Sequence, residues 1–189
     1  MSPILGIWAS QNYSRYSLPT SFDSIATTTV GAGGTSTITF TSIPQTYTHL
    51  QVRLIGRTGR ASTEDVLKVT FNSDTANNYS WHNVAGYGTG VEANGFASQN
   101  NMTLGWITAA NDAAGIFGTA IFDILDYANT SKYKTSRSLT GYDWNGGGQL
   151  LLASGSWRNT SAITSITITP SFSALNQYSS FALYGIKGD

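Results

Sequence analysis

The sequence predicts an all-β fold, an antiparallel sandwich or barrel of about eight to ten strands. The stretch Thr37–Arg53 shows why, because it holds two alternating patterns on either side of a short proline-marked joint. Ile38 and Phe40 share one face of the first pattern, and Leu50 and Val52 share one face of the second. Apolar and polar residues that alternate with a period of two are typical of a half-buried antiparallel strand.

The composition supports the same fold class. Only 11% of the 189 residues are charged, against about 25% in a typical domain, and the net charge is zero. Ser and Thr are abundant, which suits strand surfaces better than the surfaces of helices. The chain has no Cys, so disulfides, thiol catalysis and thiolate zinc sites are excluded. A chain of this length forms one domain with a sizeable core, which needs no metal or disulfide.

The first strands lie beside glycine-rich and proline-marked turns. Ile25–Val30 leads through Gly31–Gly34 into Ser36–Ile43, and this arrangement predicts a hairpin because Gly supplies the positive φ angles of tight turns. Two further alternating stretches follow, at Tyr47–Arg57 and Asp65–Asn72. Each of these four stretches is therefore expected to be a strand.

The second half of the chain continues the pattern after an irregular region. Residues 73–95 are rich in Asn, Gly and aromatic residues, and they predict long loops around one short strand, Tyr79–Val84. The remaining strands are expected at Asn101–Thr108, Phe117–Asp126, Ser136–Trp144, Gln149–Trp157, Ala162–Thr169 and Phe181–Ile186. No stretch has helical periodicity and no linker divides the chain, so residues 23–189 are expected to form a single β-sandwich domain.

Residues 1–22 are predicted to form an extended N-terminal arm. Ile4, Leu5, Ile7 and Trp8 are large and apolar, and Trp is enriched where subunits meet. We expect the arm to dock on a neighbouring subunit or on a larger particle; the alternative is that it folds back onto its own domain. The segment lacks the basic start and long apolar core of a secretory signal peptide.

No set of residues predicts catalysis or metal binding. His49 and His82 are not expected to act as the base of a serine hydrolase, because the chain contains no G-x-S-x-G nucleophile motif. Alternation places Asp123 and Asp126 on opposite faces, so they do not form the carboxylate pair of a glycosidase. Asn72–Asn78 has the residue types of a calcium loop without the spacing of one. The sequence therefore predicts no enzyme, no cofactor and no metal site.

Aromatic residues interleaved with Asn are the candidate ligand contacts. Tyr79, Trp81 and Tyr87 occur among several Asn residues, and Trp144 precedes another. Saccharide sites combine exposed aromatic rings with amide and carboxylate groups, so these four residues are candidates for binding a host glycan. The alternative is that the rings fill the core or a subunit interface.

Two arginines are candidates for contact with another subunit. Arg53 and Arg57 are expected to point outward from the same strand, where they could pair with the carboxylates of a neighbour. Nucleic acid is not expected as a partner, because a neutral chain lacks the positive field that replaces counterions. A membrane helix is not expected either, since no apolar run approaches ~20 residues.

An ordered series of short segments carries a family resemblance over nearly the whole chain. The segments are Ile4–Ser10, Phe22–Ala26, Thr37–Phe40, Ile43–Tyr47, His49–Arg53, Phe71–Thr75 with Asn78 and Tyr79, Tyr127–Thr130 with Lys134, Trp157, and Leu183–Ile186. In this series the chain resembles a group of small structural proteins of tailed bacteriophages.

The resemblance implies a jelly-roll-like β sandwich that is carried on the virion. It implies a non-enzymatic role in capsid decoration or cementing, or in a fibre, tail or neck, after assembly in the host cytoplasm. It also implies a homo-oligomer, with a trimer favoured, that contacts other virion proteins. No catalytic motif is carried over. The alternative is a carbohydrate-binding module on the virion surface that contacts the host.

Overall fold

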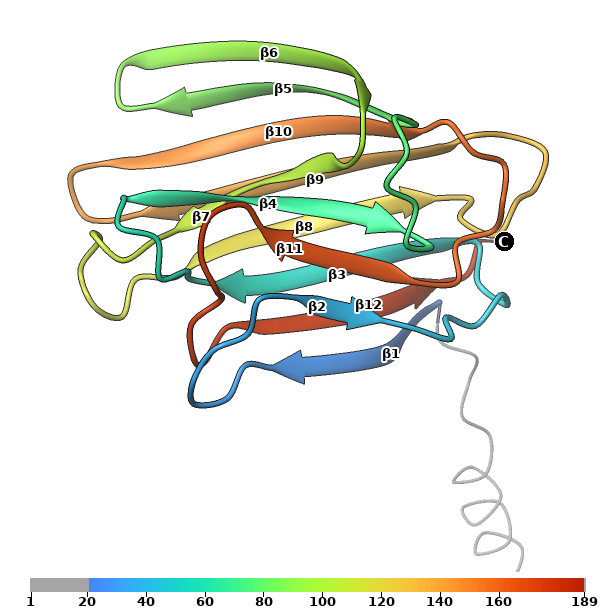
Figure 1. Ribbon diagram of the computed structural model, residues 1–189, viewed down its shortest axis with the longest axis horizontal. Helices are drawn as coiled ribbons and strands as arrows, with labels where there is room; N and C mark the ends of the chain where they lie inside the picture. The colour runs from blue at the N-terminus through green and yellow to red at the C-terminus, as the bar shows by residue number, and fades with distance from the viewer. Residues whose placement is uncertain (1–20, 189) are drawn as a thin grey trace, which may run out of the picture.

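The computed structural model describes residues 21–188, which form two facing β-sheets (Figure 1). The predicted arm residues Ile4, Leu5, Ile7 and Trp8 lie outside the described residues. Residues 21–188 contain no helix that is long and apolar enough to cross a membrane. The prediction of an all-β antiparallel sandwich is confirmed.

The described residues form twelve strands. They are β1 (Phe22–Thr29), β2 (Ile38–Phe40), β3 (His49–Gly56), β4 (Glu64–Phe71), β5 (Tyr79–Tyr87), β6 (Gly90–Gln99), β7 (Met102–Thr108), β8 (Gly118–Leu125), β9 (Lys134–Asp143), β10 (Gly148–Trp157), β11 (Ile166–Pro170) and β12 (Ser180–Ile186).

The two sheets differ in width. The large sheet has eight strands in the order β1-β12-β3-β8-β9-β10-β5-β6, and the small sheet has four in the order β2-β11-β4-β7. We call the face of the large sheet that meets the small sheet its inner face, and the opposite face its outer face. Figure 1 shows β5 and β6 beyond the edge of the small sheet, with no strand of that sheet over them. These two strands are called the overhang.

The core lies between the inner face of the large sheet and the small sheet. Ile38, Phe40, Leu50 and Val52 are all buried in it, as their alternation predicted. At its centre the Phe71 ring stacks on Phe122 and meets Trp157 edge-on; the three side chains come from β4, β8 and β10. Burial of apolar side chains on this scale is the main stabilising contribution to such a fold.

The predicted hairpin between the first two strands is wrong. β1 pairs with β12 in the large sheet, whereas β2 pairs with β11 in the small sheet. The glycine-rich turn therefore carries the chain from one sheet to the other. Gly34 has a φ of 73°, and a side chain there would lie 2.6 Å from the Leu175 carbonyl oxygen. The glycines serve this close crossing rather than a hairpin turn.

Strand β6 was not predicted. It pairs with β5 through a turn at Gly88, whose φ is 55°. Because β6 is an edge strand outside the small sheet, most of its residues are exposed on both faces. No buried face exists to impose an apolar alternation on its sequence.

Arg57 is buried, which corrects its assignment as an outward-facing contact residue. Only 8% of it is exposed, and its guanidinium donates hydrogen bonds to the main-chain carbonyls of Ala110, Asp112, Ala113 and Ile116, at 2.7 to 3.2 Å. Arg57 therefore holds the loop between β7 and β8 in place. The alternation of β3 ends at Gly56, so a prediction that continued it to Arg57 failed.

The buried carboxyl group of Asp112 lies in the same loop. Its Oδ2 atom has no hydrogen-bond partner. Burial raises the pKa of Asp112, and the nearby Arg57 guanidinium only partly opposes that effect. Because the folded pKa exceeds the unfolded one, the folded state loses stability as the pH rises through the folded pKa.

We expect Asp112→Asn to stabilise the protein at pH 7, by about 1 kcal/mol, because the amide removes the buried charge. The gain should shrink towards pH 3, where the wild-type carboxyl group is protonated in both states. Urea unfolding of both proteins at the two pH values measures the difference. The exposed Asp143→Asn is the matched control, and a less stable Asp112→Asn at pH 7 would contradict the expectation.

Candidate functional site

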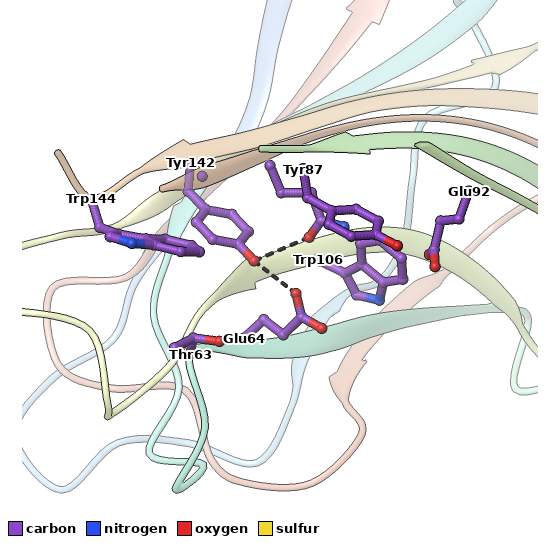
Figure 2. A pocket seen from close by; sticks show the side chains of 9 residues that line it. Thr63, Glu64, Tyr87, Glu92, Trp106, Tyr142 and Trp144 are labelled. Atoms are coloured by element: carbon purple, nitrogen blue, oxygen red, sulfur yellow. Dashed lines mark hydrogen bonds between the residues drawn. The ribbon is translucent and has the colours of Figure 1, made fainter. Parts of the chain in front are cut away.

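A cleft of ≈330 Å³ opens where the inner face of the large sheet passes the edge of the small sheet (Figure 2). Its size falls in the range of small-molecule sites. Its lining combines aromatic rings, two carboxylates and an amide: Thr63, Glu64, Tyr87, Glu92, Trp106, Tyr142, Trp144, Gly148 and Gln149. Both sheets contribute to it, since Glu64 begins β4 and Trp106 lies on β7, the edge strand of the small sheet.

Three lining residues form one row across neighbouring strands. Gln149 on β10 lies directly opposite Tyr87 on β5 and also directly opposite Tyr142 on β9. Residues in such a row project to the same face of a sheet, here the inner face. The pairing of β10 with both neighbours thus aligns a tyrosine, a glutamine and a second tyrosine along one wall of the cleft.

A tight turn holds Trp144 at the mouth of the cleft. The Trp144 N–H donates to the Gly147 carbonyl at 2.9 Å, and the indole stacks on Tyr142 with ring centroids 5.4 Å apart. The indole also covers Gly147, where a built Cβ atom would lie only 2.3 Å from it. A residue with a side chain at Gly147 would therefore push the indole out of its place.

The Tyr142 hydroxyl joins the two walls. It donates to Glu64 Oε2 at 2.8 Å, a contact drawn as a dashed line in Figure 2, and it lies 3.1 Å from Gln149 Oε1. Burial, reinforced by the Glu64 carboxylate, raises the pKa of Tyr142, so the hydroxyl keeps its proton. One proton serves one acceptor, and the carboxylate is the stronger of the two. The Gln149 amide therefore lies beside this hydroxyl, and its remaining hydrogen-bonding groups line the cleft.

The inner face of the overhang continues the aromatic surface beyond the cleft. Trp81 on β5 and Phe96 on β6 are register partners whose ring centroids lie 4.3 Å apart. Asn83 and Asn94 are partners two positions closer to the cleft, and the Asn94 N–H donates to Asn83 Oδ1 at 3.2 Å. Aromatic and amide groups thus share this part of the inner face, where Asn83 is buried and Asn94 and Phe96 are exposed.

The structure separates the four predicted glycan contacts. Tyr87 and Trp144 line the cleft, and half-buried Trp81 lies further along β5 with Phe96. Tyr79 is fully buried, and its hydroxyl donates to the Asp74 carbonyl at 3.0 Å, so it cannot contact a ligand. Tyr79 and Tyr87 face the same side of β5, but that side is buried at Tyr79, Asn83 and Ala85 and exposed at Tyr87.

Seven of the nine lining residues were not predicted from the sequence: Thr63, Glu64, Glu92, Trp106, Tyr142, Gly148 and Gln149. Tyr142 sits at an inward position of a strand, where an aromatic residue indicates core. Glu64 and Trp106 come from the other sheet, and no local pattern relates them to β9 or β10. Only the pairing of the strands reveals that these side chains meet.

A second surface lies on the outer face of the large sheet. Ala93, Val84, Leu152, Leu139 and Ile121 are successive register partners on β6, β5, β10, β9 and β8. We call these five residues the apolar row. All five are exposed, Leu152 by 53% and Leu139 by 45%. Exposed apolar side chains are thus adjacent on five neighbouring strands.

Charged residues border the apolar row on one side. Arg137 Nε donates to Asp123 Oδ2 at 3.0 Å, and Gln51 Nε2 donates to Asp123 Oδ1 at 2.7 Å. Arg53 lies directly opposite Ile121, and its guanidinium lies 5.0 Å from the centre of the Phe22 ring. Arg53 thus remains an exposed candidate for subunit contact, unlike Arg57.

Within residues 21–188 no group of three His, Asp or Glu side chains is arranged to hold a metal ion. Glu64 and Glu92 are the carboxylates of the cleft, and Asp123 lies on the opposite face of the large sheet. Comparison with known proteins found no family model, no curated protein and no solved structure that matches this chain.

Proposed function

We propose that the protein is a non-enzymatic structural component of a tailed-bacteriophage virion that acts through contacts with copies of itself and with the particle. The ordered series of segments that resembles small virion proteins supports this proposal. The role is capsid decoration or cementing, or a part in a fibre, tail or neck, and the protein is assembled in the host cytoplasm.

The strand pairing supports a jelly-roll topology for this component. If the hairpins β5–β6 and β9–β10 are set aside, eight strands remain. The first pairs with the last (β1–β12), the second with the seventh (β2–β11), the third with the sixth (β3–β8) and the fourth with the fifth (β4–β7). Nested pairs of this kind arise when one long hairpin wraps into two sheets, as in the jelly rolls of viral capsids.

The exposure of the apolar row is the observation that best supports a role in assembly. Covering its half-exposed aliphatic side chains stabilises a complex by roughly 1 kcal/mol for each large residue. The outer face holds both signs of charge, with Arg53 and Arg137 against Asp123 and Asp143. A face that is balanced in charge suits a second copy of itself. The occupant we propose is therefore another subunit, in a symmetric homo-oligomer with a trimer favoured.

We expect the double variant Leu139→Ser, Leu152→Ser to weaken self-association at least tenfold, because each Ser removes apolar area from the contact. Sedimentation equilibrium of the full chain measures the association constant. Both side chains are half-exposed, so the circular dichroism spectrum should not change. Ser154→Ala, outside the row on the same face, is the matched control. A monomeric wild-type protein at high concentration would contradict the proposed contact.

The N-terminal arm is the proposed attachment segment, through Ile4, Leu5, Ile7 and Trp8. β1 begins at Phe22, whose ring stacks on Tyr184, so a truncation that keeps the sheet intact removes residues 1–20.

Deleting residues 1–20 should abolish binding to particles that lack this protein, while the β domain stays folded. Cosedimentation with such particles measures the binding, and circular dichroism checks the fold. Full binding by the truncated chain would overturn the role of the arm.

A second candidate function is carbohydrate binding on the virion surface, with a host glycan as ligand. The specific observation is the cleft, where the Tyr87 and Trp144 rings lie beside the Gln149 amide and two carboxylates. Sugars stack their apolar faces on such rings and hydrogen-bond to such polar groups.

For this function we expect Trp144→Ala to reduce glycan binding about tenfold, because it removes the stacking surface at the mouth of the cleft. A glycan array with purified protein identifies the ligand, and titration calorimetry measures the loss. Tyr133→Ala, an exposed aromatic residue outside the cleft, should have no effect. An array on which the wild-type protein binds nothing would overturn the carbohydrate role.

A further inference from the structure

We propose that the cleft selects a saccharide that carries a protonated amine, such as an oligosaccharide of glucosamine. This inference rests on the carbohydrate-binding function and names the chemical class of its ligand. Two features of the lining lead to it: its carboxylates, which are negatively charged and only accept hydrogen bonds, and its aromatic rings.

The lining is negatively charged. Glu64 and Glu92 are its charged residues, and neither takes part in an ion pair within residues 21–188. Arg60 is bonded to the Glu64 main-chain carbonyl at 3.0 Å, but its guanidinium packs on the Phe172 ring, 3.9 Å from the ring centre. Neither Arg60 nor Phe172 lines the cleft. A ligand amine would meet two carboxylates there that have no cationic partner.

The rings of the cleft suit a cation as well as a sugar. Tyr87, Trp106, Tyr142 and Trp144 line it from three strands and one turn. Figure 2 shows Glu64 reaching between Tyr142 on one side and Tyr87 and Trp106 on the other. The negative face of an aromatic ring attracts an ammonium group, and several rings together form the cages that hold organic cations.

The charged groups of the cleft only accept hydrogen bonds. These groups are the carboxylates of Glu64 and Glu92, and one Glu64 oxygen already accepts the Tyr142 hydroxyl proton. An ammonium group offers three donors to such a site. A ligand carboxylate would be repelled, so acidic sugars are excluded from this cleft.

The test compares matched ligands by titration calorimetry on the full chain. Glucosamine tetramer and N-acetylglucosamine tetramer share one backbone, and the amine of the first is replaced in the second by a neutral acetamide. We expect the amine form to bind at least tenfold more tightly. Its affinity should fall as salt rises, because exposed ion pairs are screened. Tetramethylammonium and glucuronate serve as the cation without a sugar and the sugar with the opposite charge.

Two variants test the carboxylates directly. Glu64→Gln and Glu92→Gln remove the charges and keep the side-chain shapes, and the amide oxygen that replaces the Glu64 carboxylate can still accept the Tyr142 hydroxyl proton. Together they should remove the preference for the amine tetramer and leave the acetylated tetramer unaffected. Asp143→Asn, at the end of β9 and outside the cleft lining, should preserve the preference. Circular dichroism confirms the fold of each variant.

The outcomes separate this inference from the function on which it rests. Equal binding of both tetramers would overturn the selection for an amine and leave carbohydrate binding in place. Tetramethylammonium that binds as tightly as the amine tetramer would support the cation site and overturn the carbohydrate function. No binding of any of these ligands would overturn the selection for an amine, and the carbohydrate function would also be overturned only if the glycan array showed no binding.

Discussion

The alternation of side chains along the strands governs both surfaces of this molecule. A strand sends every second side chain to the same face, whether or not a second sheet covers that face. The large sheet has eight strands and the small sheet has four, so the rule that builds the core also leaves inward-facing side chains uncovered beyond β7. The cleft exists because the two sheets differ in width.

Two hairpins create that difference. The hairpin β9–β10 joins the large sheet where β9 pairs with β8, and β5–β6 joins it where β5 pairs with β10. The register of β10 with its two neighbours aligns Tyr87, Gln149 and Tyr142 on the inner face. It also aligns Val84, Leu152 and the rest of the apolar row on the outer face. The proposed ligand site and the proposed subunit contact therefore lie on opposite faces of the same paired strands.

Much of the core could be predicted from sequence, and much less of the cleft. Ile38 and Leu50 were placed correctly because their burial follows from alternation within one strand. β6 escaped prediction because neither of its faces is buried, so its sequence carries no alternation. Tyr87 and Trp144 could be proposed as ligand contacts from their type and setting, whereas Glu64 enters the cleft only through the packing of one sheet on the other.

The sequence by itself determined where most strands lie and which of their residues share a face, because both are properties of neighbouring residues. The tertiary structure decided which strands pair and where the small sheet ends. That choice separates Tyr79, buried at one end of β5, from Tyr87, exposed to a ligand at the other. Both tyrosines occupy positions on the same face of one strand. Only contacts with residues that are distant in sequence distinguish them.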